Sequence, residues 1–159
     1  MPLLEFTLIN NKKLKLFPTR AAAAGFTGRN RNAVRAHIAE LEEQGIPAPQ
    51  DFPIVFPILP QLLCQETNIQ VVGSHTTPEV EPVILFNDNE VYLTVGSDQT
   101  DRALEAVHMT LSKNVCPKPI ANSAWPLFEI LPHWDSLLLE AETPEGVVQR
   151  GTLAELLPY

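Results

Sequence analysis

Residues 79–95 read EVEPVILFNDNEVYLTV, and this stretch decides the kind of fold to expect. Val, Ile, Leu, Phe and Tyr dominate residues 79–86 and 91–95, which is the composition of β-strands. Asn87-Asp88-Asn89 between them contains residue types that favour tight turns. We therefore predict a β-hairpin with strands at Glu79–Phe86 and Val91–Val95.

Further segments on both sides of this hairpin carry strand or helix signals. Strands are expected at 3–9, 14–17, 68–72, 137–141 and 146–149, and helices or helical turns at 32–44, 101–112, 125–130 and 152–157. Asn30 or Asn32 can cap the first helix, and Gly45 ends it. Residues 21–28 are expected to form a connector, and 51–63 an extended, irregular segment. This mixed order predicts an α+β fold rather than a regular βαβ alternation.

Length and composition limit the kinds of protein to consider. The 159 residues fit one domain, and 45% hydrophobic residues are too many for a disordered chain. A net charge of −8 repels phosphate backbones, so no nucleic-acid partner is expected. The apolar runs are too short to span a membrane, and the N-terminus lacks the pattern of a secretory signal. Cys64 and Cys116 form no disulfide framework, so a reduced, cytoplasmic location is expected.

Three carboxylates stand near the ends of the central hairpin. Glu79 and Glu81 alternate on one strand, so both side chains point to the same face, about 6.5 Å apart at Cα, and both can reach one hard cation. Spacing alone is also typical of a solvated acidic strand. Asp98 follows the second strand and precedes a helix, where it can complete an oxygen-ligand site or cap the helix.

Other charged residues allow a catalytic and a structural interpretation. His37 and Glu40 share one face of the predicted helix, as a general base and its orienting carboxylate would, or as an ordinary surface pair. Lys113 lies near the end of a helix, where it complements the helix dipole. A basic cluster near the start of the first helix can hold a small anion or be a solvated face: Arg29, Arg31 and Arg35.

The order of these motifs resembles that of the fumarylacetoacetate hydrolase superfamily. The matching segments are Gly-Arg-Asn at 28–30, His-x-x-Glu at 37–40, Pro-Glu-Val-Glu-Pro at 78–82, Ser-Asp-x-Thr-Asp-Arg at 97–102 and Ser-Lys-x-x-Cys-Pro-Lys-Pro at 112–119. The resemblance implies one fumarylacetoacetase-like domain over 1–159, with its motifs within 28–119. Its sheet would be β-rich, mixed and rolled or barrel-like, with a few flanking helices.

The resemblance also implies a chemistry. Mg²⁺ or Mn²⁺ would be held by Glu79, Glu81 and Asp98, and the enzyme would hydrolyse or decarboxylate a small 1,3-dicarbonyl or 2-oxo acid at a C–C bond. The residues expected to act on the substrate are His37, Glu40 and Lys113 as catalytic groups and Arg29 and Arg102 as substrate-binding groups.

The same resemblance leaves two alternatives to an enzyme open and implies a homodimer. The chain ends where domains of that superfamily continue, so it can be a truncated, non-enzymatic relative; a small-anion binding module is the other alternative. A shortened sheet would keep an unpaired edge, and such edges pair with other chains, so a homodimer is expected.

Overall fold

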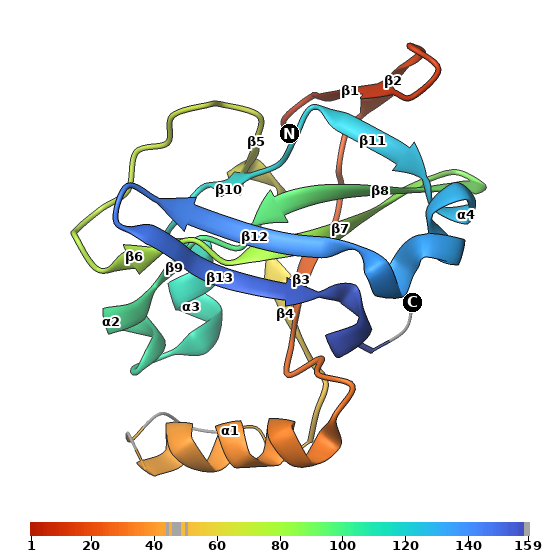
Figure 1. The fold of residues 1–159 in the computed structure, drawn as a ribbon. Coiled ribbons are helices and arrows are strands. Elements are labelled where there is room, and N and C mark those ends of the chain that lie inside the picture. Colours follow the sequence, from red (N-terminus) through yellow and green to blue (C-terminus); the bar gives the residue numbers. More distant parts are fainter. Residues whose placement is uncertain (44, 46–48, 50, 158–159) are drawn as a thin grey trace.

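The computed structural model describes residues 1–43, 45, 49 and 51–157. Its centre is a five-stranded sheet in the order β2 (Lys13–Leu16), β1 (Leu4–Leu8), β11 (Ser123–Pro126), β8 (Glu90–Ser97) and β7 (Val80–Asn87) (Figure 1). Neighbouring strands are antiparallel except β1 and β11, which are parallel. The predicted hairpin is thus confirmed as β7–β8, with Val80 opposite Ser97 and Asn87 opposite Glu90. Its turn contains Asp88 with a φ of 53°.

Four two-stranded ladders surround the sheet. They are β3 (Ala21–Gly25) with β4 (Ile54–Ile58), β5 (Leu63–Cys64) with β10 (Lys118–Pro119), β6 (Thr76–Thr77) with β9 (Thr100–Asp101), and β12 (Leu138–Thr143) with β13 (Gly146–Thr152). The helices are α1 (Arg31–Glu43), α2 (Arg102–Glu105), α3 (Met109–Asn114) and α4 (Leu127–Ile130), with 3-10 turns η1 (Pro60–Leu62), η2 (Leu131–Ser136) and η3 (Leu153–Glu155).

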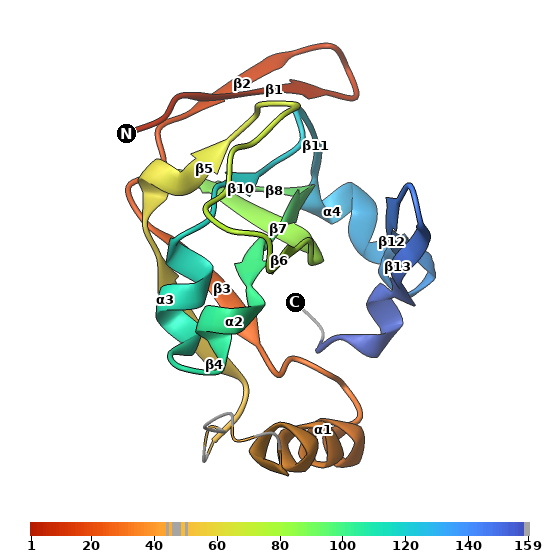
Figure 2. The ribbon, with the colours of Figure 1, turned by 90° about the vertical axis from the view of Figure 1, so that its left-hand side faces the viewer.

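Each face of the β7–β8 hairpin contributes to a different apolar core. Leu85 and Tyr92 pack with Leu4 and Phe6 on one face. On the other face, Leu93 packs with a cluster from α4, η2, η3 and β12: Leu127, Trp134, Leu153 and Leu139. Figure 2 shows β12 and β13 on one side of the hairpin and β5 and β10 on the other. The hairpin is therefore fixed from both sides, which makes the end of it a rigid support for side chains.

The predicted α+β class is confirmed, while the barrel-like sheet is not, because the strands among the described residues do not close into a barrel. Three local predictions are wrong. Residues 21–25 form β3 instead of a connector, because Ala21–Gly25 pair with the apolar strand β4. Residues 68–72 form no strand, and the predicted helix at 101–112 is broken into α2 and α3. No described helix combines the length and apolarity needed to cross a membrane.

Helix α1 lies apart from the sheets in both views (Figures 1 and 2). It spans the predicted segment, and Asn30 caps it by accepting hydrogen bonds from the amides of Asn32 and Ala33. Val34 is its buried residue. The predicted Gln44 end of the helix falls outside the described residues.

Candidate active site

The three predicted carboxylates gather where the β7–β8 hairpin meets β9. Glu79 directly precedes β7, and its carbonyl accepts a hydrogen bond from the Asp98 amide at 2.8 Å, so the ladder continues beyond the strands. Glu81 lies opposite Gly96. Since alternate residues share a face, Glu79, Glu81 and Asp98 extend the face that carries Leu85 and Tyr92 in the core. The apolar face of the hairpin thus ends in an acidic patch.

Lys113 on α3 lies between two of these carboxylates. Its Nζ is 2.7 Å from Oδ2 of Asp98 and 3.2 Å from Oε2 of Glu79. The hydroxyl of Thr100 is the third oxygen, at 3.5 Å from Nζ. Burial lowers the pKa of Lys113, but Glu79 and Asp98 more than offset this, so its pKa lies above the ordinary value. The Lys113 side chain is therefore charged and 90% buried, and its ammonium group is surrounded by three oxygens.

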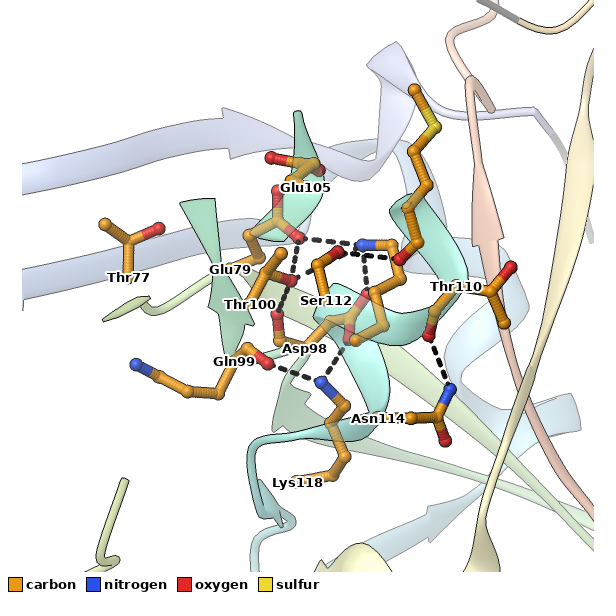
Figure 3. A network of polar contacts seen from close by, with 12 residues as sticks. Thr77, Glu79, Asp98, Gln99, Thr100, Glu105, Thr110, Ser112, Asn114 and Lys118 are labelled. Carbon is orange, nitrogen blue, oxygen red and sulfur yellow. Dashed lines mark hydrogen bonds and ion pairs between the residues drawn. The ribbon is translucent and has the colours of Figure 1, made fainter. Parts of the chain in front are cut away.

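The hydroxyl of Thr100 lies between Glu79 and Asp98 and contacts both residues. Thr100 is fully buried, and its hydroxyl contacts the carbonyl oxygen of Asp98 at 2.7 Å and Oε2 of Glu79 at 3.2 Å (Figure 3). The neighbouring Asp101 caps α2 by accepting a hydrogen bond from the Leu104 amide at 3.0 Å. Asp101, and not Asp98, thus caps the helix, and the Asp98 carboxylate is directed at the lysines.

Lys118 approaches Asp98 from the other side. Its Nζ is 2.9 Å from Oδ1 of Asp98 and donates a hydrogen bond to the carbonyl of Gln99 (Figure 3). The contact with Oδ1 is an ion pair without the angles of a hydrogen bond. Gly96 permits this approach, because a Cβ there would lie 3.0 Å from the carbonyl oxygen of Pro119. A larger residue at 96 would push β10, and with it Lys118, away from the carboxylates.

Arg102 closes the outer side of the cluster. Its guanidinium binds Oε1 of Glu79 at 2.9 Å and Glu105 at 2.8 Å, and its Nε donates to the hydroxyl of Thr77 at 2.6 Å. These partners raise the pKa of Arg102 above its ordinary value in spite of partial burial. Glu79 is therefore held by a different cation at each of its two oxygens.

Glu81 is the carboxyl group of the cluster that these cations do not neutralise. Four carboxylates share the three cations Lys113, Lys118 and Arg102, as the ion pairs of Glu79, Asp98 and Glu105 show. Burial, together with the nearby charges of Glu79 and Asp98, raises the pKa of Glu81 to about 7. The cluster therefore has a surplus of negative charge that a proton on Glu81, or an added cation, can neutralise.

A cavity of about 1020 Å³ lies between this cluster and α1. Glu79, Arg102, Glu105 and Lys113 form one polar wall, and His37 faces them from α1. The remaining lining is largely apolar and includes Phe56, Met109, Val34, Leu41 and Leu156. A second hollow lies beyond Asp98 and is lined by Glu81, Ser97 and Lys118 among others. A small molecule in the first cavity would thus reach Lys113 and Glu79 directly.

The other predicted site residues are distributed around the cavity. His37 Nδ1 lies 3.6 Å from Glu40 Oε2, and both side chains are more than 60% exposed. His37 lines the cavity, whereas Glu40 is not part of its lining. Arg29 lines it too, but its guanidinium binds Asp135 at 2.8 Å and donates to the Leu156 carbonyl.

The three arginines near the start of α1 have different partners. Arg31 stacks on the ring of Phe52 at 3.9 Å and donates to the Phe52 carbonyl, and Arg35 lies 6.0 Å from the same ring. Arg29 is engaged with Asp135. Arg31 and Arg35 therefore share the Phe52 ring, whereas Arg29 is directed at another part of the chain.

No group of three carboxylate, imidazole or thiol side chains within the described residues is arranged to hold one metal ion. Glu79 and Asp98 point at Lys113 instead. A divalent cation would fit the chemistry of these oxygens, but it would have to take the place of the Lys113 ammonium and recruit Glu81.

Sequence reasoning did not identify Lys118, Thr100 and Glu105 as site residues. Lys118 stands between two prolines in Cys116-Pro117-Lys118-Pro119, a setting that holds it in an extended segment and fixes its direction. That local signal does not reveal its partner, because Asp98 is 20 residues away and is reached only through the packing of β10 on β8.

Comparison with known families corrects the predicted resemblance. A family model described as "Protein of unknown function (DUF2848)" matches residues 24–159. No curated protein and no solved structure matches the chain significantly. The assignment to the fumarylacetoacetate hydrolase superfamily is therefore wrong, since the family found is a different one and no match links the chain to that superfamily. The motifs behind it, short and individually common, were too weak to identify a family, and the idea of a shortened C-terminus falls with it.

Proposed function

The chain belongs to the DUF2848 family, and we propose that it is a divalent-metal-dependent enzyme that hydrolyses or decarboxylates a small 1,3-dicarbonyl or 2-oxo acid at a C–C bond. The carboxylate set of Glu79, Glu81 and Asp98, with its surplus negative charge, carries this proposal; Glu79 lines the first cavity, and Glu81 and Asp98 line the second hollow. Oxygen ligands of this kind suit Mg²⁺ or Mn²⁺. A cytoplasmic location fits the two free cysteines.

We assign a separate role in the proposed reaction to each of the polar groups around the cavity. A cation on the carboxylates would supply Lewis-acid stabilisation of the developing enolate oxygens. Lys113 and Arg102 both line the cavity and would hold the negative charge of the substrate. His37 faces them from α1 and is suited to move a proton, with Glu40 orienting its ring. The apolar lining gives room for a carbon chain attached to the acid.

The direct test is turnover of oxaloacetate and of an acylpyruvate with Mg²⁺ or Mn²⁺. We expect loss of substrate that stops with EDTA, after correction for reaction with the cation in buffer alone. Asp98→Asn should reduce turnover at least about a hundredfold, whereas the exposed Glu66→Gln should leave it unchanged. No turnover of either substrate, together with no cation binding, would contradict the proposal.

His37 provides a second test, of the catalytic role alone. His37→Ala should lower kcat at least about a hundredfold and leave cation binding intact, because His37 lies across the cavity from the carboxylates. Cation binding is measured by calorimetry on the same preparation. Unchanged kcat in this variant would remove His37 from the mechanism without affecting the metal proposal.

A further inference from the structure

The first cavity is larger and more apolar than the smallest oxo acids require. Its volume of about 1020 Å³ is at the upper end of the range for sites that enclose drug-sized ligands, roughly 300–1,000 Å³. Arg102 and Lys113 belong to its polar wall, whereas Phe56 and Met109 belong to its apolar part. An acid as small as oxaloacetate, bound at the polar wall, would leave the apolar part in contact with water, which is unfavourable.

The apolar part of the cavity extends to helix α1, which lies apart from the sheets (Figures 1 and 2). Val34, His37 and Leu41 line the cavity, and their spacing places them on one face of the helix. A helix of 13 residues is only marginally stable unless such a face is packed. Phe56 on β4 and Met109 on α3 line the same cavity. An apolar chain between α1 and these two side chains would bury apolar surface on both sides.

The charges that line the cavity are balanced. The lining contains three cations and three carboxylates: Arg29, Arg102, Lys113, Glu79, Glu105 and Glu155. Arg102 contacts its partners through all three of its nitrogens, but a guanidinium has five N–H groups, so it can still bind one small acceptor. A second carboxylate on the substrate would bring a charge into the cavity that this balanced lining does not offset.

We propose that the substrate is an acid with a single carboxylate and a long apolar chain, with its acid end at Arg102 and its chain between α1 and the apolar wall. This inference rests on the proposed function for the reacting end of the molecule and names the substrate class. Long-chain acylpyruvates, which are 1,3-dicarbonyl acids, have this form, whereas the dianion oxaloacetate does not. The bound chain also stabilises α1, because it gives the apolar face of the helix a partner.

Turnover as a function of chain length is the direct test. With Mg²⁺ present, kcat/KM should rise about threefold for each methylene added to the acyl chain of an acylpyruvate, until the cavity is filled. Octanoylpyruvate should therefore be turned over at least about thirtyfold more efficiently than acetylpyruvate and than oxaloacetate. A kcat/KM that does not depend on chain length would overturn the inference while the metal-dependent function stands.

A binding measurement separates the contribution of the chain from the reaction. Calorimetry in EDTA should give a Kd for 2-oxodecanoate at least about thirtyfold lower than for 2-oxobutanoate. Leu41→Asp should weaken binding of 2-oxodecanoate at least about tenfold, because it places a charge beside the apolar chain. Ala39→Asp is the matched control, exposed on the same helix and outside the lining, and should change the Kd less than about twofold. Equal effects of the two substitutions would overturn the inference.

Hydrogen exchange tests the role of α1 in the wild-type protein, so it does not depend on the folding of a variant. Saturating 2-oxodecanoate should slow exchange of the α1 amides at least about fivefold, and 2-oxobutanoate should leave it unchanged. Failure of 2-oxodecanoate to bind, or to protect α1, would overturn the inference. Tight binding of 2-oxodecanoate without turnover of any acylpyruvate would instead refute the proposed function and leave the chain site in place.

Discussion

Single residues determine the electrostatics of the site, and the carboxyl group of Glu81 has a pKa raised towards neutral pH. Its pKa is raised from 4.5 to about 7 by burial and by its carboxylate neighbours. A carboxyl group with a raised pKa stabilises the folded state while it is protonated, fully below the unfolded value of 4.5. This contribution is lost as the pH rises through about 7.

Replacing Glu81 by Gln therefore has a pH-dependent effect on stability. Relative to the wild type, Glu81→Gln should gain about 2 kcal/mol in free energy of unfolding between pH 5.5 and 8.5, because 1.5 pH units below the folded pKa correspond to about 2 kcal/mol. Guanidinium unfolding in EDTA at both pH values measures this difference. A difference that does not change with pH would show that Glu81 titrates normally.

Lys118 is buried more completely, and its loss should be costly at every pH. Lys118→Met leaves the Asp98 carboxylate with one fewer cation and the Gln99 carbonyl without its donor. Removing one partner of a buried ion pair destabilises a protein by about 3 kcal/mol or more. Thermal and guanidinium unfolding should show this loss, whereas the exposed Lys12→Met should change stability by less than about 0.5 kcal/mol. A Lys118→Met protein as stable as the wild type would mean that the pair is not formed.

At the scale of elements, the sequence predicted most reliably where the signal is local. The β7–β8 hairpin follows from two apolar runs and an Asn-Asp-Asn turn, and the shared face of Glu79 and Glu81 follows from strand alternation. β3 could not be predicted because an Ala-rich segment has little strand preference of its own and is fixed by pairing with β4. The break between α2 and α3 was missed because His108 caps α3 with its ring nitrogen.

The candidate site shows the same division. Lys113 was found from its place in the order of motifs, although the family inferred from that order was wrong. Its partners could not be read from spacing, because Asp98 and Glu79 reach it from segments 15 and 34 residues away. Local patterns thus predicted which side chains are functional candidates, and packing between distant segments decides which of them interact.

A side chain of β13 binds the backbone at the edge of β7. The Gln149 side chain on β13 accepts a hydrogen bond from the Val80 amide at 2.7 Å and donates one to the Val80 carbonyl at 3.0 Å, as a neighbouring strand would. Gln149→Ala should destabilise the protein by about 1–2 kcal/mol, since two hydrogen bonds to a partly buried backbone are lost. It should also increase hydrogen exchange at the Val80 amide at least about tenfold.

In the hydrogen-exchange measurement, amides that bond between β7 and β8 serve as an internal reference. Exchange at amides between β7 and β8, such as that of Leu85, should change much less, because those bonds belong to the paired side of the strand. The exposed Gln70→Ala serves as the matched substitution. Unchanged protection of Val80 in Gln149→Ala would show that another group covers this edge.

The central sheet of the molecule is open, with β2 and β7 as its terminal strands. In the central sheet, β7 is the terminal strand, and Gln149 pairs with its backbone at Val80, near one end of the strand. Further along, the side chain of Phe86 is 70% exposed, and the hollow beside this strand is lined by apolar residues that include Val55, Ile84 and Leu157. An apolar strand at the edge of a sheet favours pairing with another chain.

We therefore expect a homodimer that pairs through β7, with a mass in light scattering of twice the 17.6 kDa of one chain. Phe86→Glu should shift the protein to the monomer, because it places a charge within the apolar contact. The exposed Phe128→Glu, on α4, is the control and should remain dimeric. If the wild type is a well-folded monomer at about 10 mg/ml, the edge of β7 does not need a partner chain. The Gln149 contact is then sufficient to protect it.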